Sequence, residues 1–197
     1  MQKIINETKL DFDDVLIRPK RSILKSRSEV SLLRSFNFKY SPRELTCIPI
    51  VVANMDTVGT FQMAKSLVNY QGLTCLHKHY GVEEYVNFFT NENIINKNLV
   101  FYSLGTSHKD IEKITEVFNR IKKLNYDLPN ICVDVANGYT EQFVKIVSNI
   151  RKLYEEVVIM VGNVVTPEIV EELIIHGKAD IVKVGIGSGS VCTTRLK

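Results

Sequence analysis

The sequence predicts an α/β fold, a (β/α)8 TIM barrel of which this chain would supply an N-terminal arm and about six βα units. Three observations lead to this prediction. Short, nearly continuous apolar runs recur along the chain, segments with helical periodicity lie between them, and the turn after the first run has no dinucleotide-binding glycine pattern. This alternation is typical of parallel βαβ units.

Composition indicates an ordinary globular chain, expected to form a single domain over residues 1–197. Its 45% of apolar residues can fill one core, and a formal net charge of +3 is too small to predict a nucleic-acid partner. Neither a secretory signal nor an apolar run of membrane-spanning length is recognisable, so we expect no membrane association. Four cysteines without a Cys-x-x-Cys pair favour a reducing, cytoplasmic location.

The N-terminal arm, up to about residue 45, alternates acidic and basic residues in "DFDDVLIRPKRS" (11–22) and is expected to lie on the surface. The six predicted strands follow it. They are nearly continuous apolar runs, as expected for strands buried on both faces, at residues 47–55, 73–78, 99–105, 131–138, 157–163 and 180–187.

Two helices are clear from their periodicity and end signals. Residues 107–125 have Ser107 as a predicted N-cap and Asp110 at the third helical position. One apolar stripe on this helix comprises Ile111, Ile114, Phe118, Ile121 and Leu124. In residues 166–177, we expect Thr166 to cap the helix, Pro167 to take its first position and Gly177 to end it.

A doubly wound sheet is the alternative architecture, but it would place Gly-x-Gly-x-x-Gly where the chain reads "ANMDTVGTF" (53–61). The barrel is therefore favoured. The sixth predicted strand has no helix after it, and six units of the size usual in barrels end near this point. We expect the barrel to lack its last two βα units in this chain, and either a continuation of the natural protein beyond Lys197 or another chain would complete it.

Catalysis in a barrel takes place at the carboxyl ends of the strands. The loop after the sixth strand, "GIGSGSVCTTR" (185–195), places Cys192 among glycines and small residues. A thiolate there could act as a nucleophile, with Thr194 passing a proton to or from a leaving group. The alternative is a tight turn around a small buried cysteine. Cys47, Cys75 and Cys132 lie within strands, where we expect structural roles.

Other polar residues end the predicted strands. His77 and His79 lack a third ligand at metal-binding spacing, and Lys78 is either a phosphate contact or a solvated loop residue. Asp134 ends a buried strand, where an unpaired carboxylate is costly, so we expect it to meet a partner or ligand. For Lys183 we expect an ion pair with Asp180 or another carboxylate; a Schiff-base lysine is the alternative.

Seven segments together resemble the GMP reductases across the whole chain. They are "DFDDVLIRPKRS", "ANMDTVGTF", "HKHY", "GTS", "DVANGY", "GNVVT" and "GIGSGSVCTTR". The sister IMP dehydrogenases share the last two, but usually carry an inserted CBS domain between the second and third barrel units, and the stretch from His79 to Leu99 is too short for one. Ser188 departs from the reductase pattern, which has proline there, and matches the dehydrogenases.

The resemblance implies conversion of GMP, with NADPH, to IMP, NADP and ammonia. It makes Cys192 the thiol that forms a covalent thioimidate at purine C2 and Thr194 the proton relay for the departing ammonia. Ser190 would face the substrate phosphate. A monovalent cation, expected to be potassium, would be held by Gly187, Gly189, Cys192 and Arg195.

The resemblance also implies a cofactor site and an assembly. The residues that match cofactor-contacting positions are Lys78, Asp134, Val135, Ala136, Ile186 and Gly187, with Ser26 and Arg27 from the arm. The family pattern suggests a homotetramer and places a catalytic Glu beyond Lys197. The alternatives are oxidation of IMP with NAD, as in the dehydrogenases, and an inactive barrel fragment that acts only by association.

Overall fold

The structure is a computed structural model that describes residues 6–8, 10, 12–91 and 96–187. The chain divides into two compact units, residues 1–31 and 32–197. In the described part of the first unit the only regular elements are two short 3-10 helices, η1 (Phe12–Asp14) and η2 (Arg27–Glu29). The second unit carries all the strands and α-helices of the described residues.

Seven strands form one sheet in which each strand pairs with the next along the chain. β1 and β2 are antiparallel, and all later pairs are parallel. The strands are β1 (Arg34–Asn37), β2 (Glu44–Val52), β3 (Gly72–Cys75), β4 (Val100–Leu104), β5 (Asn130–Asp134), β6 (Ile159–Val164) and β7 (Ile181–Val184). The six predicted parallel strands are confirmed as β2 to β7; β1 was not predicted.

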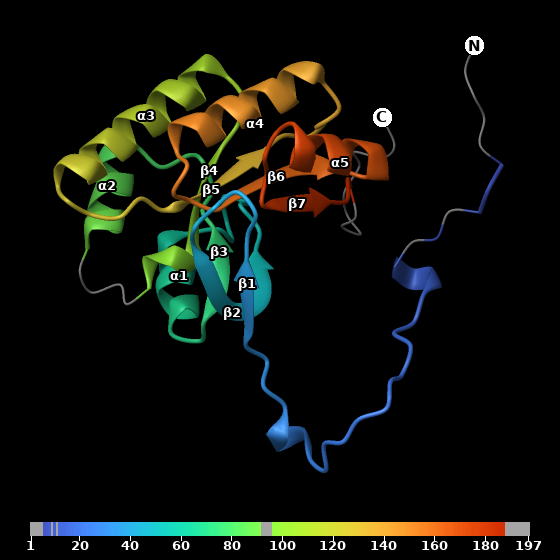
Figure 1. The fold of residues 1–197 in the computed structure, drawn as a ribbon. Helices are drawn as coiled ribbons and strands as arrows, with labels where there is room; N and C mark the ends of the chain where they lie inside the picture. Colours follow the sequence, from blue (N-terminus) through green and yellow to red (C-terminus); the bar gives the residue numbers. More distant parts are fainter. Residues whose placement is uncertain (1–5, 9, 11, 92–95, 188–197) are drawn as a thin grey trace. The chain divides into compact units, whose positions relative to one another are not determined.

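Between consecutive parallel strands lies one α-helix, and a further 3-10 turn, η3 (Lys97–Leu99), precedes β4. The helices are α1 (Phe61–Val68), α2 (Val82–Thr90), α3 (His108–Lys123), α4 (Glu141–Leu153) and α5 (Pro167–Ile175). Figure 1 shows them flanking the row of strands. A doubly wound sheet reverses its strand order at a switch point. The uninterrupted order β2 to β7 therefore supports the barrel-type βα series.

The ends of α3 and α5 test the predicted caps. Ser107 caps α3 and forms a capping box with Asp110, as predicted. Thr166 occupies the N-cap of α5 and Pro167 its first turn, but the Thr166 side chain makes no capping hydrogen bond. The prediction that Leu124 belongs to the apolar stripe of α3 is wrong. Leu124 is the C-cap residue and is 53% exposed, because the helix has already ended.

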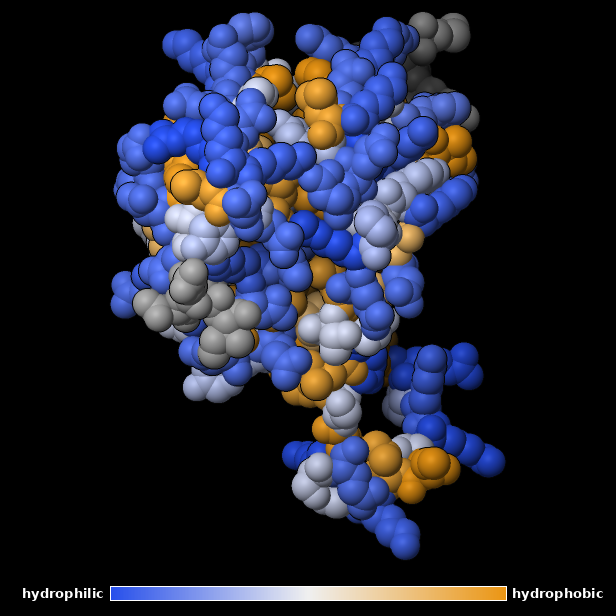
Figure 2. Space-filling model, turned by 60° about the vertical axis from the view of Figure 1, so that its left-hand side comes forward, coloured by the Kyte–Doolittle hydropathy of each residue, from blue (hydrophilic) through white to orange (hydrophobic). Residues whose placement is uncertain are grey.

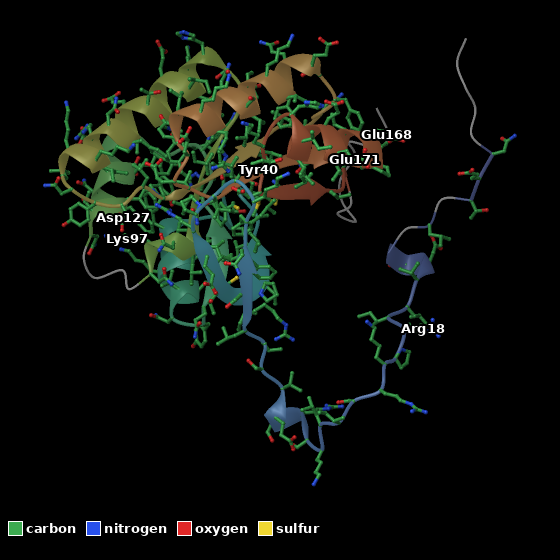
Figure 3. The ribbon with its side chains drawn as sticks, in the orientation of Figure 1. Arg18, Tyr40, Lys97, Asp127, Glu168 and Glu171 are labelled. Carbon is green, nitrogen blue, oxygen red and sulfur yellow. The ribbon has the colours of Figure 1, made fainter. Side chains whose placement is uncertain are left out.

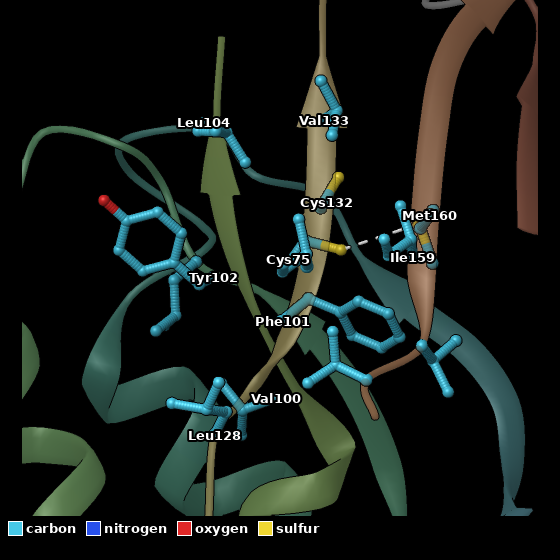
Figure 4. Close-up of a cluster of buried hydrophobic side chains, with 14 of the residues drawn as sticks. Cys75, Val100, Phe101, Tyr102, Leu104, Leu128, Cys132, Val133, Ile159 and Met160 are labelled. Carbon is cyan, nitrogen blue, oxygen red and sulfur yellow. Dashed lines mark hydrogen bonds between the residues drawn. The ribbon is translucent and has the colours of Figure 1, made fainter. Parts of the chain in front are cut away.

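The core covers both faces of the sheet. Figure 4 shows Phe101 of β4 and Cys132 of β5 on the same side as Met160 of β6, whereas Tyr102 points to the opposite side, where its ring packs against Phe118 of α3. Cys47, Cys75 and Cys132 are all buried and free, consistent with the structural roles predicted for them. The Cys75 thiol donates to the Met160 sulfur at 3.8 Å.

The β1–β2 hairpin reaches the amino ends of the later strands. Figure 3 shows Tyr40 at its turn. Close by in the chain, the Arg43 guanidinium donates to the side-chain oxygen of Asn130, the first residue of β5, at 3.0 Å. Asn130 is fully buried; the same oxygen accepts from the Val158 N–H at 3.0 Å, and its amide donates to the Asn98 carbonyl at 2.6 Å. One amide side chain thus ties four segments together.

A buried ion pair fixes the entry to β7. Arg151 of α4 pairs with Asp180, and both side chains are nearly inaccessible, with exposures of 4% and 0%. The guanidinium also donates to four backbone carbonyls, those of Lys178, Tyr154, Glu155 and Val157. The Asp180 carboxylate accepts from the Ile159 N–H at 2.9 Å. Burial raises the pKa of Asp180, and the bonds from Ile159 and Arg151 oppose that rise.

Polar side chains cover most of the face seen in Figure 2, with smaller apolar patches between them. Within the described residues, none of the helices combines the length and the hydropathy that a membrane crossing requires.

Candidate functional site

Three polar side chains from three separate strands meet near the carboxyl edge of the sheet. Lys183 lies in β7, Asp134 is the last residue of β5, and Asn54 follows β2. The Lys183 ammonium forms an ion pair with Asp134 Oδ1 and donates to Asn54 Oδ1 at 3.2 Å. The predicted partner for Asp134 is thereby confirmed, and the carboxylate that pairs with Lys183 is Asp134 and not Asp180.

Lys183 is held as a cation. Burial lowers the pKa of Lys183. The electrostatic interaction with Cys132, together with the hydrogen bond to Asp134 and the charge of that carboxylate, raises it by more, so that the pKa lies above its usual value. A Schiff-base lysine must react as the neutral amine. The arrangement therefore does not support the alternative of a Schiff-base Lys183.

The thiols of Cys75 and Cys132, which lie near this ion pair, belong to the core. Interaction with the Cys75 thiol lowers the pKa of Cys132, burial opposes that change, and the Lys183 charge lowers it further. The pKa of Cys75 is raised well above its usual range, first by Cys132 and then by burial. Both side chains lie inside the packed centre of Figure 4, where a nucleotide has no access. We assign neither of them a catalytic role.

The "HKHY" segment is anchored by its first and last residues. His77 is buried, stacks on Tyr80 with a centroid separation of 4.0 Å, and accepts from the His79 N–H through Nδ1. The His77 carbonyl accepts from the Tyr85 hydroxyl at 2.6 Å. These contacts fix the backbone and leave the intervening Lys78 exposed. In the part of the chain that the structure describes, no cluster of three His, Cys, Asp or Glu residues suits a metal.

A pocket of about 450 Å³ opens beside Val135, between the loops that follow β4 and β5. Its lining residues are Thr106, Ser107, Val135, Asn137, Thr140, Gln142, Phe143 and Ile146. The pocket contains the start of α3 at Ser107 and the N-cap of α4 at Thr140. Backbone N–H groups at such helix starts suit an anionic or polar ligand.

Backbone bonds hold the "DVANGY" segment against β6. The Val135 N–H donates to the Gly162 carbonyl at 2.8 Å, and the Asn163 N–H donates to the Val135 carbonyl at 2.9 Å. Tyr139 closes the segment, because its hydroxyl accepts from the Val165 and Thr166 N–H groups. Of the predicted cofactor residues, Val135 lines the pocket. Its chain neighbours Asp134 and Ala136 are not among the lining residues, and Ala136 is exposed.

The glycine loop after β7 is described only at its start. Gly185 and Gly187 have φ values of 134° and 63°, a left-handed backbone that favours glycine. Ile186 between them is half-buried. The remaining predicted residues of this loop lie outside the described part of the chain: Gly189, Ser190, Cys192, Thr194 and Arg195.

The predicted arm residues belong to the first unit. Ser26 caps η2: its hydroxyl accepts from the Ser28 N–H at 3.2 Å. Arg27 opens that short helix and is exposed. Their contact with a cofactor stays a prediction.

Lys183 and Asn54 are the residues of this constellation that the sequence did not assign to the site. For Lys183 a signal was available. The available signal was a charged residue inside the otherwise apolar run "DIVKVG" (180–185). That signal shows that a partner is needed. It does not show which of the chain's carboxylates supplies it.

Comparison with known proteins identifies similar chains. The family model described as "IMP dehydrogenase / GMP reductase domain" matches residues 9–197. The chain is 53% identical over 197 residues to "GMP reductase 2" of Bos taurus, covering 100% of this chain and 55% of that one. It is 52% identical over 195 residues to the "GMP reductase" of Escherichia coli O81 (strain ED1a), with coverages of 99% and 55%.

Among solved structures, the inosine 5′-monophosphate dehydrogenase of Legionella pneumophila superposes with a TM-score of 0.76 at 29% sequence identity. The match covers 95% of this chain and 54% of that one. The chain therefore spans about 55% of the length of the curated relatives it matches.

Proposed function

Because the chain belongs to the IMP dehydrogenase / GMP reductase family, we propose that the protein that carries it reduces GMP to IMP, with NADPH as reductant and ammonia as the second product. The observation that carries this proposal is identity of 52–53% to the GMP reductases of Bos taurus and Escherichia coli over essentially the whole chain. The unbroken βα series and the polar constellation at its carboxyl edge are consistent with it.

The proposed chemistry begins with Cys192. Its thiolate adds to purine C2, and the C2 amino group leaves as ammonia with a proton passed by Thr194, which leaves a thioimidate. The reduced dinucleotide supplies the hydride that this carbon then takes up. Release of the thiolate restores the enzyme and yields IMP. Covalent catalysis of this kind divides one difficult substitution into easier steps.

The residues around Asp134 fit a dinucleotide. A carboxylate can accept hydrogen bonds from ribose hydroxyls, and the pocket lined by the next residue, Val135, offers hydroxyl, amide and helix N-terminal groups. Lys78 is exposed on a backbone that His77 and Tyr80 hold in place. Ile186 and Gly187 extend the proposed cofactor site, and Ser26 and Arg27 belong to the same proposal. An Arg fork suits the 2′-phosphate of NADPH.

Two further parts of the proposal come from the family resemblance. A potassium ion would bind at Gly187, Gly189, Cys192 and Arg195, and Ser190 would face the substrate phosphate. A homotetramer is the proposed assembly. Activity measured in potassium and in sodium, and the mass of the assembled protein in solution, test these two parts.

Oxidation of IMP with NAD is the second candidate, favoured by the superposition on a dehydrogenase and by Ser188. The experiment uses the longest chain that contains this sequence. Loss of the near-ultraviolet absorbance of NADPH on addition of GMP supports the reductase. Formation of NADH from NAD and IMP, without NADPH consumption, would make the protein a dehydrogenase.

The thiol is tested by substitution. Cys192→Ala should abolish turnover and retain GMP binding, because only the covalent step is lost. The matched control is Cys47→Ala, at a buried cysteine of β2. It should retain activity and lower the free energy of unfolding by about 1 kcal/mol. Near-normal turnover by Cys192→Ala would refute the covalent mechanism.

A further inference from the structure

Lys183 and Asp134 sit in one row across three strands. Asp134 of β5 is in register with Gly162 of β6, and Gly162 is in register with Lys183 of β7. Side chains in such a row point to the same face of a parallel sheet. The ion pair therefore spans the intervening strand at the position where that strand has no side chain.

Gly162 is what makes this span possible. A Cβ built on it would lie 2.5 Å from the Lys183 Cβ and 2.8 Å from the Lys183 carbonyl oxygen. Real side chains do not approach that closely, so any other residue at position 162 would displace Lys183. The row thus combines a glycine, a cation and a carboxylate that depend on one another.

The ammonium leaves one carboxylate oxygen of Asp134 available. Lys183 engages Oδ1 and also donates to Asn54 Oδ1 at 3.2 Å, which fixes the amine between β5 and the loop after β2. Within the described residues, Oδ2 of Asp134 has no hydrogen-bond partner, and the Asp134 side chain is 32% exposed. A carboxylate held by one oxygen presents the other in a defined direction, which a freely rotating aspartate would not do.

We propose that Lys183 is a positioning residue for the cofactor: by holding Asp134 through Oδ1, it presents Oδ2 to a ribose hydroxyl of the bound dinucleotide. The inference rests on the proposed function, since it takes Asp134 as a cofactor contact. Lys183 itself need not touch the cofactor. Its effect should therefore appear in dinucleotide affinity and should depend on Asp134.

The test measures NADPH binding by calorimetry and steady-state turnover, again with the longest chain that contains this sequence. Lys183→Met removes the charge and keeps most of the volume. It should weaken NADPH binding about tenfold to a hundredfold, which is the usual range for losing a charge-assisted hydrogen bond. The KM for GMP should change little. Lys183→Arg, which keeps a cation for Asp134, should bind NADPH within about threefold of wild type.

A double-mutant cycle gives the sharper criterion. If Lys183 acts through Asp134, Lys183→Met combined with Asp134→Asn should bind NADPH no more weakly than the weaker single variant. The matched control is Lys122→Met, which breaks a lysine–glutamate pair on the outer surface of α3 and should leave binding unchanged. If Lys183→Met does not fold, Lys183→Gln replaces it in the cycle.

Each outcome decides the proposal. Wild-type affinity in Lys183→Met, loss in Lys183→Arg equal to that in Lys183→Met, or additive losses in the cycle would overturn it. So would a wild-type protein that binds no dinucleotide. If NADPH binds with the expected pattern but GMP is not converted, the proposed reaction fails and the positioning role of Lys183 stands.

Discussion

Replacement of Arg151 by alanine should destabilise the second unit far more than loss of any surface ion pair. The side chain is 4% exposed, its partner Asp180 is fully buried, and the guanidinium serves four carbonyls as well. Removing one member of a buried pair leaves an uncompensated charge, which typically costs about 3 to 5 kcal/mol. For a chain of this size that corresponds to a fall in Tm of roughly 6 to 20 °C, at about 2 to 4 °C per kcal/mol.

The matched control is Arg120→Ala. Arg120 makes two contacts with the carboxylate of Glu83, between α3 and α2, but this pair lies on the surface with Glu83 70% exposed. Exposed pairs contribute little, because water already solvates both charges. Urea unfolding of both variants, followed by circular dichroism, gives the two free energies on one scale.

A further variant separates charge from hydrogen bonding. Arg151→Met combined with Asp180→Leu removes both buried charges and should recover part of the lost stability. Recovery should be incomplete, because the carbonyls served by Arg151 and the Ile159 N–H would remain without their partners. If Arg151→Ala costs no more than Arg120→Ala, the reasoning from burial is wrong.

Two more predictions concern stability. Burial, followed by the charge of His79, lowers the pKa of His77 in the folded protein. In the unfolded chain this imidazole is protonated near pH 6.5, whereas in the folded chain it stays neutral at that pH. The free energy of unfolding should therefore fall as pH decreases from about 7.5 to 5.5, with a weaker fall in His77→Gln; equal slopes would contradict this. Asn130→Ala should lower the free energy of unfolding by about 2 to 5 kcal/mol in urea, because it leaves the Val158 N–H and the Asn98 carbonyl without their hydrogen-bond partner. Asn69→Ala, at an exposed amide, should cost under about 0.5 kcal/mol, and equal losses at the two sites would refute the assignment.

Much of the βα series was predictable because its signals are local. A strand covered on both faces needs an apolar run, and the six runs correspond to β2 through β7. The α3 start followed from Ser107 and Asp110, three residues apart. β1 escaped prediction because its sequence, "RSFN", has no such run and all four residues are exposed. Its pairing with β2, and not its composition, makes it a strand.

The sequence by itself determined the family, the order of the elements and the need for partners at Asp134 and Lys183. Only the tertiary structure decided which partners these are. Asp180 lies three residues before Lys183, yet it pairs with Arg151, while Lys183 contacts Asp134, 49 residues away, and Asn54, 129 residues away. The physical reason is the sheet register: it aligns Asp134, Gly162 and Lys183 in one row, and no local pattern in the chain encodes that alignment.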